Sequence, residues 1–165
     1  MRLSHTKLIM ISGAIWFVIG VYLLQLGLNL LLEDISANGI FEYGRHPLLS
    51  TFTKYVGSLQ SAALLLVVLA LFIGYFKGRY VLGKSAHKGV ARIRSFPNPA
   101  KLSNIYSPKY YLLLGSMIAL GISIKYLGLS NDVRGLIDAT IGSALINGAM
   151  VYFKLAQNVK ARSEC

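Results

Sequence analysis

Acidic residues are scarce in this sequence of 165 residues. It contains six Asp and Glu against 17 Lys and Arg, and none of the six lies between residues 43 and 131. General acid–base catalysis and the binding of hard metal ions both depend on carboxylates. The central part of the chain therefore offers no carboxylate for either kind of chemistry.

Cysteine and histidine are equally sparse. The one cysteine, Cys165, cannot form an intramolecular disulfide, and His5, His46 and His87 fall in three separate loops or tails. A zinc site needs such ligands close together, and the sequence has neither a nucleotide-binding glycine loop nor a nucleophile elbow. We expect no metal, no cofactor and no catalytic residue, and hence a protein that is not an enzyme.

One short motif suggests an enzyme at first. The triplet Arg45-His46-Pro47 resembles the one that helps to hold S-adenosylmethionine in isoprenylcysteine-type membrane methyltransferases. That family also has a later pair of adjacent glutamates, whereas Glu164 is the only glutamate here after residue 47. The sequence therefore does not predict this activity, and residues 41–53 are expected to form a loop or a short interfacial helix.

Apolar residues are abundant. They make up 55% of the chain, and charged residues only 14%, against about 25% in a typical soluble domain. The apolar residues gather in four stretches, each close to the roughly 20 residues that cross a bilayer: 8–32, 57–76, 110–129 and 135–153. Polar residues do not recur along them at helical spacing, as they would in a soluble bundle. The sequence predicts a single all-α integral membrane domain, a bundle of four transmembrane helices.

The basic residues predict the topology. Thirteen of the 17 lie in the N-terminal tail, in residues 77–109 and in the C-terminal tail, which share one side if four helices cross in succession. Lys and Arg are retained in the cytoplasm. We therefore expect both termini and a basic loop at 77–109 to be cytoplasmic. Compact loops and this charge bias favour a bacterial inner (plasma) membrane.

The basic loop contains a periodic segment. Lys84, Lys88 and Arg92 recur every four residues, and apolar residues occupy the opposite helical face: Leu82, Ala86, Val90 and Ile93. Such a helix can place its cations on anionic headgroups, at about 1 kcal/mol per basic residue, although two glycines within it weaken the helix. The predicted lipid-binding residues are Lys84, Lys88, Arg92 and Arg94. A solvated topology determinant is the alternative, while the scarcity of aromatic residues argues against nucleic acid.

Two halves of the chain resemble each other. The second and fourth apolar stretches end in the same tripeptide, Tyr75-Phe76-Lys77 and Tyr152-Phe153-Lys154. This predicts two tandem helical hairpins related by a pseudo-two-fold axis along the membrane normal. Small residues recur at helical spacing and predict close helix packing at Gly13, Gly20, Gly27, Gly74, Gly78, Gly135 and Gly142.

Two charges fall within apolar stretches, where they are costly and often functional. Lys125 and Asp138 lie on adjacent predicted spans, so we expect an ion pair that either locks the hairpin or responds to ions or protons. Arg134, one helical turn from Asp138, is a competing partner. Gln25, Asn29 and Asn147 are candidates for a polar lining or for interhelical hydrogen bonds.

The leading hypothesis is a transport- or channel-type role for a small solute or ion. Four short spans enclose little volume, so a pathway would require a homo-oligomer. The alternative is a membrane scaffold or interaction subunit, which binds anionic lipid or a protein partner through its basic loop.

Overall fold

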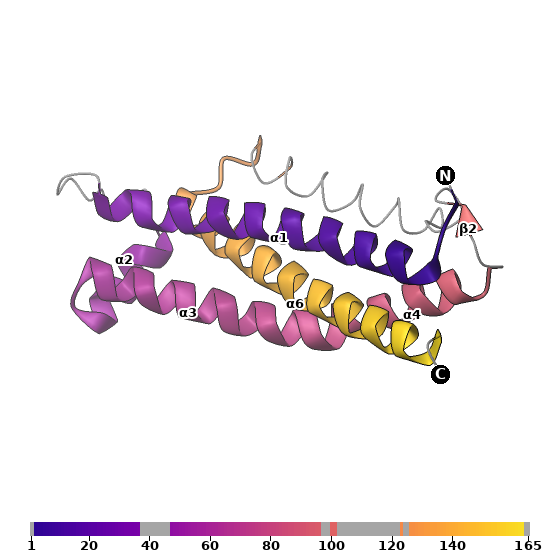
Figure 1. Ribbon diagram of the computed structural model, residues 1–165. Coiled ribbons are helices and arrows are strands. Elements are labelled where there is room, and N and C mark those ends of the chain that lie inside the picture. Colours follow the sequence, from indigo (N-terminus) through magenta and orange to yellow (C-terminus); the bar gives the residue numbers. More distant parts are fainter. Residues whose placement is uncertain (1, 37–46, 97–99, 102–122, 124–125, 164–165) are drawn as a thin grey trace.

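The computed structural model is helical and built around three long helices (Figure 1). It describes residues 2–36, 47–96, 100–101, 123 and 126–163, and the statements below concern these residues. The helices are α1 (His5–Ser36), α2 (Pro47–Val56), α3 (Leu59–Lys77), the π-helical turn η1 (Gly78–Leu82), α4 (Gly83–Arg94) and α6 (Asn131–Ser163). Two short strands, β1 (Arg2–Leu3) and β2 (Ala100–Lys101), form an antiparallel pair.

Three helical segments are long and apolar enough to cross a membrane. They are His5–Leu32, Leu59–Arg94 and Asn131–Ala161, and each contains an 18-residue stretch whose mean hydropathy is 2.1, 2.3 and 1.4, respectively. The prediction of a helical chain with long apolar helices is therefore confirmed for three of the four stretches. The stretch 110–129 falls almost wholly outside the described residues, so the four-helix bundle and the tandem hairpins stay predictions.

Large apolar side chains cover the outward faces of these helices. Val18 on α1 is 65% exposed, and Val68 and Phe72 on α3 are 65% and 63% exposed. Soluble proteins rarely expose apolar patches of this extent. The apolar outward faces are therefore compatible with insertion into a membrane.

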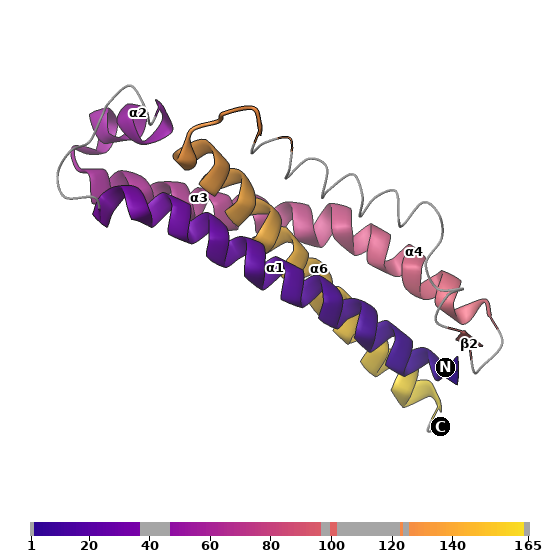
Figure 2. The ribbon, with the colours of Figure 1, turned by 90° about the horizontal axis from the view of Figure 1, so that it is seen from above.

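Glycines bring α1 and α6 into backbone contact. A Cβ added to Gly20 would lie 2.9 Å from the carbonyl oxygen of Gly142, and one added to Gly135 would lie 2.9 Å from that of Gly27. A Cβ on Gly142 would in turn overlap the backbone of Leu24. The two helices run along each other (Figures 1 and 2) at a separation that only glycine permits at these positions.

Helix α3 approaches a second face of α6 in the same way. A Cβ on Gly74 would lie 2.6 Å from the carbonyl oxygen of Thr140, and one on Gly78 would lie 2.5 Å from that of Ala144. Gly13 is also closely packed, since its Cβ would lie 2.9 Å from the Phe153 ring. Helix α6 is thus the element that α1 and α3 share.

The π-helical turn η1 keeps one face of a long helix turned towards α6. Buried small and apolar residues recur every four positions along α3: Leu66, Ala70 and Gly74, followed by Gly78 in η1. Each step of four overshoots a full α-helical turn by about 40°, so an unbroken α-helix would rotate this face away. In η1 the Gly83 N–H donates to the Gly78 carbonyl, five residues back, and the extra residue corrects the rotation. Ala86 and Val90 consequently remain buried.

Helix α2 packs at the end of the molecule opposite the termini (Figure 1). Its first turn is capped by Asp132 of α6, whose Oδ2 accepts hydrogen bonds from the N–H groups of Leu48 at 2.7 Å and Leu49 at 3.1 Å. The other oxygen, Oδ1, accepts from the Val133 N–H at 2.8 Å. Asp132 is completely buried, so its negative charge faces the unpaired N–H groups of a helix start.

Both termini and α4 lie at the other end of the molecule (Figures 1 and 2). The backbone at Arg2 pairs with that at Lys101, and a His5 ring nitrogen is 3.0 Å from the Phe96 carbonyl oxygen. These contacts fasten the start of α1 to the segment that follows α4.

Candidate functional site

Helix α4 is amphipathic, and its apolar face is directed into the bundle. Ala86, Val90 and Ile93 are buried in the same core cluster as Leu8 and Tyr152. Gly89 permits a close approach of α4, because a Cβ there would lie 2.9 Å from the Tyr152 hydroxyl. Burial of a side chain such as Val90 or Ile93 contributes about 1.5–3 kcal/mol to stability. Packing against the other helices therefore holds the apolar face of α4 in place.

The basic segment differs from the predicted loop in one respect. The helix runs without a break from Leu59 to Arg94, so residues 77–94 extend the second span rather than forming a loop with a separate helix. At 1.5 Å per residue this helix is about 54 Å long, against about 30 Å for the hydrocarbon of a bilayer. It is therefore long enough to carry α4 beyond the hydrocarbon.

The cations of α4 are exposed. The four predicted lipid-binding residues all lie on its outer surface: Lys84, Lys88, Arg92 and Arg94. Because Ala86, Val90 and Ile93 already face the bundle, these cations are presented to the surroundings of the protein.

A hollow of about 480 Å³ lies between η1 and α4 on one side and α6 on the other. Its described lining is strongly basic: Arg79, Tyr80, Gly83, Lys84 and His87 come from η1 and α4, and Val151, Lys154, Leu155 and Asn158 from α6. None of these described lining residues carries a carboxylate. Among the charged residues, Arg79 and Lys154 were not singled out as site residues from the sequence, because they belong to elements far apart in the chain.

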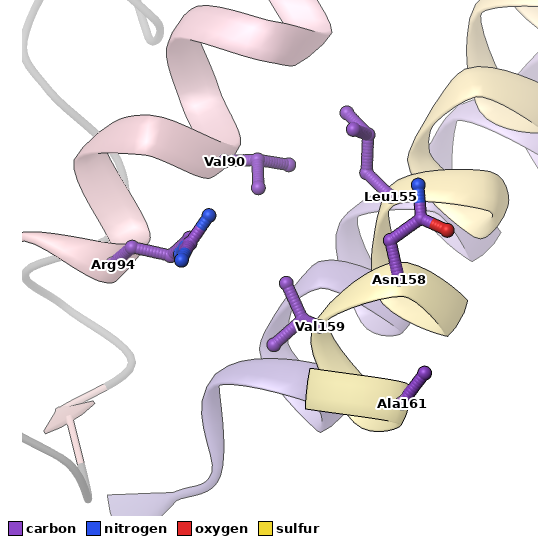
Figure 3. Close-up of a pocket in the computed structure, with 6 residues that line it drawn as sticks. All are labelled: Val90, Arg94, Leu155, Asn158, Val159 and Ala161. Atoms are coloured by element: carbon purple, nitrogen blue, oxygen red, sulfur yellow. The ribbon is translucent and has the colours of Figure 1, made fainter. Parts of the chain in front are cut away.

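A second hollow of about 500 Å³ continues along the same two helices. Figure 3 shows Arg94 and Val90 of α4 on one side of it and Leu155, Asn158 and Val159 of α6 on the other. Leu155 and Asn158 line both hollows. We call the two together the α4–α6 groove.

Only one residue of the predicted intramembrane charge pair, Asp138, belongs to the described part of the chain. Asp138 on α6 is 6% exposed, and its Oδ2 lies 3.8 Å from Nε of Arg134, one helical turn away. Lys125 lies outside the described residues, so its pairing with Asp138 stays a prediction.

The polar residues suggested as a lining do not share one environment. Gln25 and Asn29 are exposed on α1. Asn147 is half-buried on α6, and its side-chain amide donates to the Ser143 carbonyl at 2.9 Å. The Ser143 hydroxyl in turn donates across to the Leu71 carbonyl of α3 at 3.3 Å. The polar groups on α6 therefore make hydrogen bonds within and between helices.

The Arg45-His46-Pro47 motif lies outside the described residues except for Pro47, the first residue of α2. Within the part of the chain that the structure describes, no group of three His, Cys, Asp or Glu side chains could hold a metal ion. Comparison of the chain with protein-family models, with curated proteins and with solved structures found no match.

Proposed function

We propose that this chain is an integral membrane protein, not an enzyme, that binds anionic phospholipid with the basic end of its helix bundle and serves as a scaffold or interaction subunit. The observation that carries the proposal is the orientation of α4. Its apolar face is buried against α6 and α1 while Lys84, Lys88 and Arg92 are exposed. An amphipathic helix that buries its own apolar face leaves its cations available to an external partner.

The position of these cations, just beyond the apolar segments of the helices, supports lipid as the partner. Lys77 is the first charged residue after the apolar run of α3, and Lys154 is the first after that of α6. Both helices therefore change from apolar to basic at the end where α4 lies (Figure 1). Charges at the edge of a hydrocarbon-spanning segment lie among headgroups, where each is worth about 1 kcal/mol against anionic lipid.

Under this proposal, the positive-inside rule predicts how the protein is oriented in the membrane. The basic end, with both termini, faces the cytoplasm, and α2 faces the outside. In a bacterial inner membrane the cytoplasmic leaflet supplies the anionic lipid.

Native mass spectrometry of the purified protein in neutral detergent tests the proposal. Phosphatidylglycerol and phosphatidylcholine with the same acyl chains are added in equal amounts. We expect phosphatidylglycerol to bind preferentially and the preference to fall when Lys84, Lys88, Arg92 and Arg94 are all replaced by Gln. Equal binding of the two lipids would contradict the proposal.

Transport of a small solute or ion is the second candidate. The observation that favours it is the buried carboxylate of Asp138 within a helix long enough to span a membrane, since intramembrane acids often serve ion or proton pathways. A liposome flux assay separates the two functions. Transport requires flux that Asp138→Asn abolishes, whereas the lipid-binding scaffold shows no flux with either Asp or Asn at this position.

A further inference from the structure

The α4–α6 groove has the composition of a site for a single phosphate group. Among the described residues, three cations line one of its two hollows, Arg79 and Lys84 from one wall and Lys154 from the other, and Asn158 adds a neutral hydrogen-bond donor. Lys and Arg are the side chains that bind phosphate oxygens through charge-assisted hydrogen bonds. Among the residues that the structure describes, no carboxylate lines either hollow.

The described cations of the two walls carry charges of the same sign. Arg79 and Lys84 lie on one side of the hollow and Lys154 on the other, and like charges repel in a partly desolvated setting. A doubly contacted phosphate would replace this repulsion with attraction to both walls. The groove is thus better suited to an anion held between the helices than to one resting on α4 alone.

The apolar part of the lining indicates that the phosphate belongs to a lipid. It consists of Val90, Val151, Leu155 and Val159. Tyr80, which also lines the groove, is 61% exposed and stacks on Phe76, with ring centroids 5.9 Å apart, and exposed Tyr residues mark the headgroup level of a membrane helix. A free phosphate ion would gain nothing from apolar lining residues, whereas the glycerol and upper acyl region of a phospholipid would.

We infer that the α4–α6 groove is a saturable site for one anionic phospholipid, whose phosphate is held between the cations of η1 and α4 and Lys154 of α6. This inference rests on the proposed function and narrows it, because it distinguishes one stoichiometric lipid from a diffuse layer of headgroups. Lys88 and Arg92 line neither hollow and so belong to the diffuse layer only.

Two double variants of equal charge separate the site from diffuse attraction. Lys84→Gln with Lys154→Gln removes two groove cations. Lys88→Gln with Arg92→Gln removes two cations from the same end that do not line the groove. Both pairs are exposed on helices, so both variants should fold, which thermal unfolding in detergent checks.

The measurement is the dissociation constant of the first phosphatidylglycerol bound, by native mass spectrometry, with phosphatidylcholine as reference. We expect the groove variant to bind this first lipid about thirtyfold more weakly, from about two headgroup-contacting cations. The control pair should change it by less than about threefold and should weaken only the later binding events. Asn158→Leu leaves the net charge unchanged and should also weaken the first event.

Each alternative result has a distinct meaning. Equal losses in the two double variants would overturn the groove but leave the proposed function standing. Equal binding of phosphatidylglycerol and phosphatidylcholine by the unaltered protein would overturn both. Displacement of the first lipid by millimolar inorganic phosphate would overturn the assignment to a lipid and identify a free anion as the ligand.

Discussion

At the scale of single residues, Asp132 has a role in the structure that the sequence does not predict. In the sequence it lies between the apolar stretches 110–129 and 135–153, with no partner indicated. In the structure it is completely buried and accepts hydrogen bonds from three backbone N–H groups. Two of those groups belong to α2, about 84 residues away in the chain, and no local pattern announces a cap that is completed by a distant helix.

Replacement of Asp132 by Ala should destabilise the fold. Loss of a helix cap costs about 0.5–2 kcal/mol, and the unsatisfied buried N–H groups of Leu48 and Leu49 raise the cost towards about 3 kcal/mol. The free energy of unfolding in detergent and the hydrogen exchange of α2 measure it. The neighbouring Asn131→Ala, at an exposed position, is the control. Equal stability of the two variants would show that the cap is unimportant.

Glycine substitutions test the backbone contact between α1 and α6. In Gly142→Ala the new Cβ would meet the backbone of Leu24, and backbone cannot yield as a flexible side chain does. We expect a loss of about 1–3 kcal/mol in thermal or denaturant unfolding in detergent.

Gly83→Ala is the matched control for this substitution. A Cβ there meets nothing closer than 3.8 Å, so the better helix propensity of Ala, about 1 kcal/mol, should make this variant at least as stable as the parent. A Gly142→Ala variant with unchanged stability would contradict the close packing.

At the scale of elements, the sequence predicted the helical face of α4 but not its connection. The spacing of Lys84, Lys88 and Arg92 placed them opposite Val90 and Ile93, and the structure has the first three exposed and the last two buried. The continuity of α3, η1 and α4 was missed because the run of basic residues from Lys77 onwards predicted a loop there, and Gly83 and Gly89 weakened the prediction of a helix within it. Hydropathy predicted four long apolar helices, and three are confirmed in the described residues, because that signal extends over whole segments.

Insertion of one Ala after Val81 should rotate α4 relative to α3, whereas deletion of Val81 should not. The π-helical turn takes up one extra residue, so a chain without Val81 can run as an unbroken α-helix that keeps Val90 and Ile93 on the same face. An inserted residue instead turns the following helix by about 100° and moves them out of contact with the bundle. Hydrogen exchange of residues 83–94 should then accelerate in the insertion variant and stay unchanged in the deletion variant. Equal protection of α4 in the insertion variant and the parent would show that η1 does not set this register.

At the scale of the whole molecule, the arrangement has two different ends. One end carries α4, both termini and the α4–α6 groove, and the other carries α2 and its Asp132 cap (Figure 1). The apolar outward faces of α1 and α3 lie between them. The order of residues along the chain predicted this division, because the basic residues and the apolar runs occupy separate segments. The groove could not be predicted, because its walls come from η1, α4 and α6, which only the fold brings together.

The most direct test is the accessibility of the two ends in intact bacterial cells. With Cys165 replaced by Ser, a single cysteine is introduced by Thr51→Cys on α2 or by Ser95→Cys after α4, both at exposed positions, and is treated with a membrane-impermeant maleimide. The account predicts labelling of the α2 variant in intact cells and of the α4 variant only after the membrane is opened. Labelling of the Ser95→Cys variant in intact cells would contradict a bilayer-spanning bundle whose basic end faces the cytoplasm.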